Sequence, residues 1–171
     1  MAQAEGNSKY HSGSDPRTLR EALGNFATGV TVVTAIGDKG DPVGLTANSF
    51  TSVSLDPPLL LVCPAKGAAT TQALLASEHF AINVLHTGQQ AISKLFATKG
   101  SDRFAETEFE TWKHGVPIIR NSLASFECRK YAINDGGDHL ILVGEIMHVR
   151  YAPDLDPLLY FRSEYRDLEQ S

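Results

Sequence analysis

Small hydroxyl and amide side chains are concentrated in one stretch of this chain, residues 44–58, which reads G-L-T-A-N-S-F-T-S-V-S-L-D-P-P. Asn, Ser and backbone groups pair with the carbonyl and N–H groups of a heteroaromatic ring, while hydroxyls and backbone N–H groups hold a phosphate. Flanking apolar segments supply contacts for the hydrocarbon end of such a ring. The mixture suits an isoalloxazine ring with a phosphate tail. On composition alone, however, the default interpretation is an edge strand whose hydroxyls face water.

The sequence lacks the motifs of most other chemistries. There is no G-x-G-x-x-G after a strand, no G-x-x-x-x-G-K-[ST] and no G-x-S-x-G. None of the six histidines belongs to an H-x-x-x-H or H-E-x-x-H motif, so we predict no metal site. We also predict no catalytic acid, base or nucleophile. A bound cofactor would then carry the redox chemistry, with the protein supplying position and electrostatics.

Composition narrows the class of partner and the compartment. The 171 residues carry a net charge of −5 with no basic cluster, which argues against a nucleic-acid partner. The longest apolar run, 59–63, is too short to cross a membrane, and the N-terminus has no signal-peptide pattern. The two cysteines, Cys63 and Cys128, are expected to be reduced thiols. We therefore expect a cytoplasmic protein with no membrane association.

One domain is expected over residues 15–171, after a small, polar and disordered tail at 1–14. Asp15 and Pro16 predict a helix start, and Leu19, Leu23 and Phe26 give that helix one apolar face.

The rest of the chain predicts a mainly β domain. Strands are expected at 31–36, 43–50, 51–55, 59–63, 80–85, 124–133 and 139–151. A helix is expected at 70–76, and Thr87 with Gln90 resembles a capping box that opens a second helix. Residues 98–117 are interpreted as a loop, and 134–138 as a turn. No strand–helix alternation persists, so an antiparallel barrel with helices packed outside is favoured over a parallel sheet.

Several segments together carry a family resemblance. They are, in chain order, A-T-G-V-T-V-V-T (27–34), the run beginning G-L-T-A-N-S-F (44–59), F-A-I-N-V-L (80–85), G-D-H (137–139) with G-E (144–145), and L-Y-F-R (159–162) with Y-R (165–166). From about Asp15 to Leu168 the chain closely resembles the short-chain flavin reductases of two-component flavin monooxygenases, such as those of hydroxyphenylacetate, phenol and chlorophenol. The string T-A-N-S-F-x-S-V-S-L-x-P-P is specific for that group; the other segments are weaker alone.

The resemblance implies an FMN-binding split β-barrel, antiparallel and Greek-key-like, assembled as a homodimer with the flavin near the subunit interface. It implies hydride transfer from NADH or NADPH to FAD or FMN, and delivery of reduced flavin to a monooxygenase that hydroxylates an aromatic substrate. No Arg cluster stands out for a 2′-phosphate, which favours NADH.

The resemblance also assigns site residues. The isoalloxazine and ribityl chain would lie along Thr31, Thr46, Ala47, Asn48 and Ser49. Pyrimidine or phosphate contacts would come from Ser52, Val53, Ser54 and Leu55. Lys66 and Thr70 are phosphate candidates, Asn83 would lie near the flavin, and Phe104 would cover the ring or the nicotinamide. The nicotinamide nucleotide would contact His139, Arg162 and Tyr165.

Two alternatives keep the same barrel. A non-enzymatic flavin- or haem-binding protein would need no access for a nicotinamide, and the G-D-H segment and Arg162 weigh weakly against it. An oxidase of the pyridoxamine-phosphate type would want more clustered Lys and Arg than this chain has.

Overall fold

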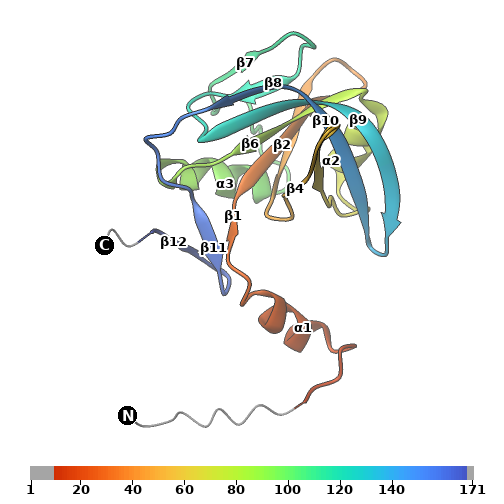
Figure 1. Ribbon diagram of the computed structural model, residues 1–171, viewed down its shortest axis with the longest axis vertical. Coiled ribbons are helices and arrows are strands. Elements are labelled where there is room, and N and C mark those ends of the chain that lie inside the picture. The colour runs from red at the N-terminus through yellow and green to blue at the C-terminus, as the bar shows by residue number, and fades with distance from the viewer. Residues whose placement is uncertain (1–9, 169–171) are drawn as a thin grey trace.

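A seven-stranded antiparallel sheet dominates the computed structural model, which describes residues 10–168 (Figure 1). The strand order is β3-β2-β6-β9-β10-β5-β4. The seven strands are β2 (Thr31–Ile36), β3 (Pro42–Ala47), β4 (Thr51–Leu55), β5 (Pro58–Val62), β6 (His79–Val84), β9 (Ala124–Gly136) and β10 (His139–Tyr151). The predicted mainly β, antiparallel architecture is confirmed.

Two smaller sheets and the helices complete the described chain. β1 (Thr28–Gly29), β11 (Leu159–Phe161) and β12 (Glu164–Arg166) form one sheet, and β7 (Phe109–Thr111) pairs with β8 (Pro117–Ile119). The helices are α1 (Pro16–Leu23), α2 (Ala69–Ala76), the short 3-10 turn η1 (Thr87–Gln89) and α3 (Gln90–Ala97).

The ends of the large sheet meet, which makes the sheet a barrel with a seam. β3 and β4 are its two edge strands, yet only residues 48–50 connect them. The four Cα–Cα steps from Ala47 to Thr51 span at most about 14 Å, so the sheet must curl until its edges are neighbours. The hydroxyl-rich stretch therefore runs along β3, across the seam and into β4.

The main apolar core combines side chains that point inward from the barrel strands with Leu74 of α2. The main cluster consists of Val33, Ala35, Leu60, Val62, Leu74, Phe80, Ile82, Cys128 and Leu142, each at most 1% exposed. Gly144 on β10 lies directly over Phe80: a Cβ there would be 2.5 Å from the Phe80 Cζ. The core thus requires a residue without a side chain at this position.

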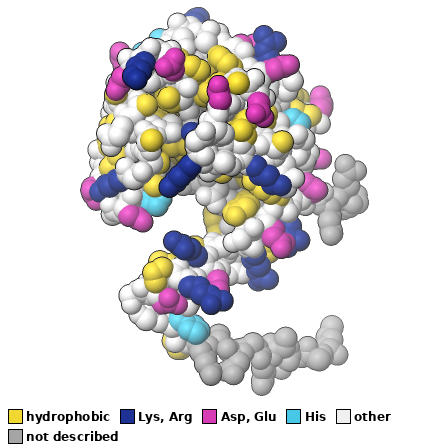
Figure 2. Space-filling model, turned by 180° about the vertical axis from the view of Figure 1, so that it is seen from behind, with side chains coloured by type: hydrophobic (Ala, Val, Ile, Leu, Met, Phe, Trp, Pro, Cys, Tyr) yellow, Lys and Arg dark blue, Asp and Glu magenta, His cyan; other side chains and the backbone are white. Residues whose placement is uncertain are grey.

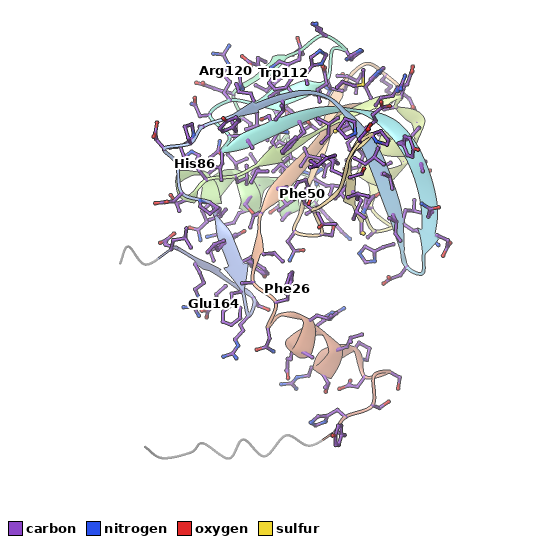
Figure 3. The ribbon with its side chains drawn as sticks, viewed as in Figure 1. Phe26, Phe50, His86, Trp112, Arg120 and Glu164 are labelled. Carbon is purple, nitrogen blue, oxygen red and sulfur yellow. The ribbon has the colours of Figure 1, made fainter. Side chains whose placement is uncertain are left out.

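The N-terminal helix α1 extends away from the barrel (Figures 1 and 2). Asp15 is its N-cap, as predicted, and accepts hydrogen bonds from the N–H groups of Arg17 and Thr18. However, α1 buries no residue, and the predicted apolar side chains of Leu19, Leu23 and Phe26 are 43%, 66% and 78% exposed. In Figure 3, Phe26 lies between α1 and the β11–β12 hairpin. The predicted tail lies partly outside the described residues, which omit 1–9, and residues 10–14 are exposed.

Three sequence-based predictions need correction. Residues 98–117 are not all loop, because β7 and the start of β8 form a short hairpin. His86, not Thr87, is the N-cap before η1, where its Nδ1 accepts from the Gly88 N–H and Gln89 completes the capping box. The turn predicted at 134–138 is shorter, since β9 and β10 stay paired up to Gly136 and His139. Within the described residues, no helix has the length and apolar character needed to cross a membrane.

Candidate functional site

A cavity of about 690 Å³ opens at the barrel seam, a size typical of pockets that hold a cofactor. Its walls come from β3 and the seam link, from the segment between β5 and α2, and from the end of α3 with the loop that follows. The lining residues are Leu45, Thr46, Ala47, Asn48, Ser49, Cys63, Pro64, Ala65, Gly67, Ala68, Ala69, Thr70, Phe96, Ala97, Lys99, Gly100, Ser101, Arg103 and His139. We call this cavity the seam pocket.

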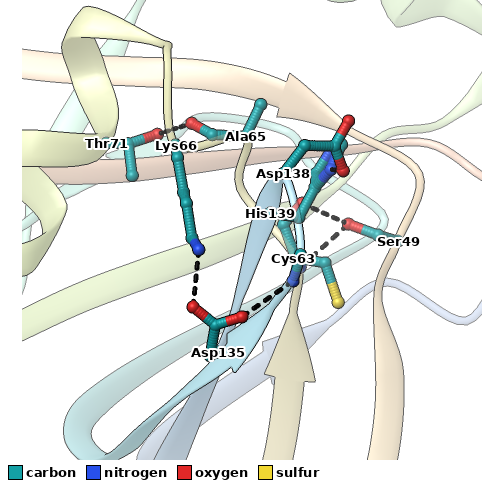
Figure 4. A network of polar contacts seen from close by, with 9 residues as sticks. Ser49, Cys63, Ala65, Lys66, Thr71, Asp135, Asp138 and His139 are labelled. Carbon is teal, nitrogen blue, oxygen red and sulfur yellow. Dashed lines mark hydrogen bonds and ion pairs between the residues drawn. The ribbon is translucent and has the colours of Figure 1, made fainter.

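One wall of the seam pocket is built from the hydroxyl-rich stretch. Ser49 Oγ accepts a hydrogen bond from the Cys63 N–H at 2.9 Å and lies 3.3 Å from the Cys63 carbonyl oxygen, which ties the seam link to the end of β5 (Figure 4). Thr46 Oγ1 donates to the Ser93 carbonyl oxygen at 2.7 Å, which ties β3 to α3. Asn48 is exposed between these two anchored residues. Its amide is therefore available for the polar edge of a ring.

The opposite end of the seam pocket suits an anion. The N-cap of α2, Ala68, has no side-chain acceptor for the first-turn N–H groups, and the helix dipole adds positive potential there. The Arg103 guanidinium reaches the same end, donating to the carbonyl oxygens of Gly44 at 2.7 Å and Thr98 at 2.8 Å. Its Nε is buried without a hydrogen-bond partner. The charge of Arg103, which also contacts Thr70 in the first turn of α2, and the uncapped start of that helix together suit a phosphate.

His139 stands at the start of β10, on the rim of the seam pocket. Its Nδ1 lies 2.7 Å from Asp138 Oδ1, and this hydrogen bond, with the charge of the imidazole, holds the pKa of Asp138 below its usual value. Lys66 Nζ is 2.6 Å from Asp135 Oδ2 and likewise lowers the pKa of that carboxyl. The Lys66 N–H donates to the Asp138 carbonyl oxygen. These contacts join the β9–β10 turn to the pocket wall (Figure 4).

Six of the predicted site residues meet in the seam pocket: Thr46, Ala47, Asn48, Ser49, Thr70 and His139. Lys66 is adjacent, since its neighbours Ala65 and Gly67 line the cavity, but its ammonium is paired with Asp135. The predicted contacts on β4 do not line the cavity; Ser52, Val53 and Leu55 are exposed there and Ser54 is half-buried.

Asn83, predicted to lie near the flavin, is not among the residues that line the seam pocket. Its side chain is fully buried in β6. Its Nδ2 donates to the Val32 carbonyl oxygen and to Thr34 Oγ1, while its Oδ1 accepts from the Ile119 N–H and from Ser125 Oγ. With these hydrogen bonds, the Asn83 side chain connects β2, β8 and β9. Thr31 is similar: it is 1% exposed and donates to the Ala47 carbonyl oxygen, so it supports the pocket wall from behind.

The remaining predicted residues lie outside the seam pocket. Phe104 packs edge-on against Phe96 and Phe109 in a second apolar cluster, behind the part of Phe96 that lines the pocket. Arg162 donates to Asn25 Oδ1 at 2.8 Å, at the junction of α1 and the β11–β12 hairpin. The Tyr165 hydroxyl is 2.8 Å from Ser93 Oγ. The Ser93 carbonyl oxygen in turn accepts the hydrogen bond from Thr46, so Ser93 lies between Tyr165 and the pocket wall.

Sequence reasoning missed several pocket residues, most notably Arg103, Lys99 and Cys63. Arg103 reaches Gly44 across 59 positions, and the polar loop around it gave no periodic signal. For Cys63 the sequence predicts only a reduced thiol, although this residue directly follows β5, which borders the seam. Burial raises the pKa of its thiol. Its position directly after β5 could have indicated a pocket residue, because the ends of strands commonly border binding sites.

The family model described as the flavin reductase like domain matches residues 23–169. The chain belongs to this family. It is 48% identical over 151 residues to the stachydrine N-demethylase reductase subunit Stc3 of Rhizobium meliloti, covering 88% of this chain and 65% of that one. It is 47% identical to the FMN reductase (NADH) SmoA of Agrobacterium fabrum, covering 86% and 83%. The reductase subunit HsaB of a flavin-dependent monooxygenase from Mycobacterium tuberculosis is 41% identical, covering 91% and 83%.

Solved structures agree with the family assignment. The NADH:FAD oxidoreductase SgcE6 of Streptomyces globisporus superposes with a TM-score of 0.91 at 37% identity, covering 96% of this chain and 99% of that one. A second structure of SgcE6, in complex with NAD and FAD fragments, gives a TM-score of 0.88. The fold is thus the split barrel of these flavin reductases, as the resemblance implied. The chain spans 65% of the length of Stc3 and 42% of a probable flavin reductase from the same bacterium.

Proposed function

We propose that this protein is a flavin reductase that moves a hydride from NADH to FMN or FAD bound in the seam pocket. The observation that carries the proposal is the polarity of that pocket. Amide and hydroxyl groups form one wall, and the other end, with the start of α2 and Arg103, is suited to bind a phosphate. Family membership and the NADH-dependent flavin reductases among the relatives support it.

The pocket residues would divide the flavin between them. Asn48 and the backbone of the seam link would pair with the pyrimidine edge, and Leu45 and Phe96 supply apolar surface. The α2 N-terminus, Thr70 and Arg103 would hold the phosphate. When bound, the flavin supplies the electrophilic ring that accepts a hydride. The β4 residues Ser52 to Leu55 would contact any part of the flavin that extends beyond the seam pocket along β4.

The protein's contribution would be positional. Hydride transfer needs two stacked rings at close range and no protein acid or base. His139 stands on the pocket rim, where its imidazole, oriented by Asp138, would contact the nicotinamide of NADH. Arg162 and Tyr165 do not line the seam pocket. They would therefore contact the part of NADH that extends outside the pocket, or stabilise the β11–β12 hairpin.

The reduced flavin would leave for a separate oxygenase. Several relatives are named as reductase subunits or components of flavin-dependent monooxygenases, HsaB among them. We propose the same handover here, to an oxygenase that hydroxylates an aromatic substrate. Release of reduced flavin fits a pocket that opens along a barrel seam.

We further propose a homodimer. α1 buries nothing within its own chain, and Leu19, Leu23 and Phe26 are exposed on an arm that extends from the barrel. The long β9–β10 hairpin also exposes Tyr131, Ile133, Met147, Val149 and Tyr151. Exposed apolar surface of this extent favours burial against a partner chain. Symmetric homodimers are the commonest oligomers, so a second copy of this chain is the partner that we propose.

Steady-state NADH oxidation tests the function. The purified protein with FMN or FAD, and without any aromatic substrate, should consume NADH and bleach the flavin absorbance under anaerobic conditions. Omitting the protein gives the blank. Consumption equal to this blank with both flavins would overturn the proposal and favour a flavin-binding protein without reductase activity.

A further inference from the structure

Three histidines surround one buried carboxylate outside the seam pocket. Glu127 on β9 is 0% exposed, and His114 and His148 both contact it. The His79 ring stacks on that of His114, with 4.1 Å between ring centroids. None of the four residues lines the seam pocket, so the proposed flavin chemistry does not use them.

The two carboxylate oxygens of Glu127 have different environments. Oε1 accepts a hydrogen bond from the backbone N–H of His114 at 3.0 Å, which fixes the carboxylate plane. Oε2 faces two imidazoles: His148 Nδ1 lies 2.8 Å away and His114 Nδ1 lies 3.2 Å away. All three side-chain donor atoms fall within 4.8 Å of one another.

Local backbone features bring these side chains together. Glu127 and His148 are cross-strand partners in β9 and β10, next to a register shift that leaves Met147 as an extra residue. Such a bulge re-aims the following side chain. His114 comes from the β7–β8 turn, where Gly115 has a φ of +74° and its N–H donates to the Trp112 carbonyl oxygen. Glycine adopts that φ readily because it has no Cβ.

Although the spacing of the histidines in the sequence predicts no metal site, we propose that His114, Glu127 and His148 form a binding site for a divalent transition-metal ion of the zinc class. Two imidazole nitrogens and one carboxylate oxygen are a ligand set that Zn²⁺ takes at tetrahedral sites, with a fourth position left for water. Bonds of about 2.0–2.1 Å at tetrahedral angles place neighbouring donor atoms about 3.3 Å apart. The nitrogen–oxygen separations of 3.2 and 2.8 Å are within a small side-chain adjustment of this value.

The surroundings favour a cation at this position. Among the described residues, no Lys or Arg forms an ion pair with Glu127, although a buried carboxylate needs compensating charge. Ala81, Val116 and Ile118, each at most 2% exposed, form an apolar cluster beside it. The His114 and His148 side chains are about one-third exposed, so an ion can enter from solvent. A bound ion would fasten the β7–β8 hairpin to β9 and β10.

The test uses the 171-residue chain without an affinity tag, stripped with EDTA and dialysed. Co²⁺ is titrated while its visible d–d absorption is recorded, and Zn²⁺ is titrated by calorimetry. The wild type is compared with His114→Ala and His148→Ala, and with His11→Ala as a control that removes an exposed imidazole elsewhere. Circular dichroism confirms that each variant is folded.

We expect one equivalent of metal per chain, with the cobalt bands of a four- or five-coordinate site. Affinity should fall at least tenfold in each site variant and stay unchanged in His11→Ala. Zn²⁺ should raise the Tm of the wild type and of His11→Ala only. Absence of saturable binding to the wild type, or equal binding by His148→Ala, would overturn the proposal. NADH oxidation with FMN, measured in parallel, should persist in His148→Ala, which separates this site from the proposed reductase function.

Discussion

The two asparagines that the sequence assigns to the flavin site have opposite environments in the fold. Asn83 is fully buried and bonded to three strands, whereas Asn48 is exposed in the wall of the seam pocket. We predict that Asn48→Ala weakens FMN binding about five- to a hundredfold, because one hydrogen bond to a buried ligand is worth roughly 1–3 kcal/mol. Flavin fluorescence titration measures the change, with Asn134→Ala on β9 as the control. Unchanged FMN affinity would remove Asn48 from the flavin site.

A variant of His139 tests the nicotinamide site separately from the flavin site. His139→Ala should raise the KM for NADH about two- to tenfold while leaving FMN affinity near that of the wild type, because His139 stands on the pocket rim. Steady-state rates against NADH at saturating FMN provide the measurement. If His139→Ala instead released flavin with no change in the NADH dependence, His139 would belong to the flavin site.

Arg103 offers a test of the phosphate end. Its guanidinium lines the seam pocket, 3.2 Å from Thr70 Oγ1 at the start of α2, so a phosphate bound there would gain a charge-assisted interaction. We predict that Arg103→Gln lowers FMN affinity roughly tenfold or more and leaves riboflavin, which lacks the phosphate, almost unaffected. Arg120→Gln, an exposed arginine away from the seam pocket, is the matched control. Equal losses for FMN and riboflavin would point to a collapsed pocket instead.

The two cysteines should differ in reactivity. Burial, with a contribution from the Glu127 carboxylate, raises the pKa of Cys128 to about 12, and burial also raises the pKa of Cys63. A raised pKa leaves less thiolate at any lower pH, and thiolate is the reactive form. At pH 8 we expect slow modification of Cys63 alone by a thiol reagent, slowed further by FMN in the seam pocket. Cys63→Ser should abolish it, and two equally reactive thiols would contradict the prediction.

At the scale of elements, Gly144 determines how β10 crosses the core. An added Cβ would be 2.5 Å from Phe80 Cζ and 3.0 Å from Cys128 Cβ, and neither neighbour is exposed. Gly144→Ala should therefore lower the free energy of unfolding by about 1–3 kcal/mol through overpacking. Urea denaturation measures this. Gly29→Ala, where nothing lies within 4 Å of the added atom, is the control. Equal midpoints for the two variants would show that the barrel yields easily at Gly144.

Strands with a clear β-rich run were predictable from sequence, and the three-residue strands were not. The strand at 139–151 has the predicted bounds because its long run of residues with high β propensity indicates a strand without tertiary information. β7 and β8 have three residues each, and their hairpin is held by tertiary contacts such as those of His114 with Glu127. The β11–β12 turn places Arg162 and Ser163 at φ of +50° and +63°, a conformation that their residue types do not signal.

At the scale of the whole molecule, the candidate site depends on barrel closure. Residues 46–49 were predictable because they are consecutive and chemically distinctive. Arg103 and the α2 N-terminus reach the same pocket only because the sheet curls and α3 packs on β3, a long-range arrangement with no local pattern. Asn83 shows the converse, since proximity in a family motif does not reveal whether a side chain points into a pocket or into the core.

Assembly is the remaining property at this scale. A monomer would leave the arm formed by α1 in water with Leu23 and Phe26 exposed, although burying side chains of this size is worth about 1.5–3 kcal/mol each. We predict that the wild type sediments at twice its chain mass of 18.5 kDa at micromolar concentration. The double variant Leu23→Lys, Phe26→Ser should shift the equilibrium toward monomer, whereas Arg17→Ser on the same helix should not. A wild type that sediments as a monomer would contradict the proposed dimer, and a double variant that stays dimeric would move the interface to the exposed face of β9 and β10.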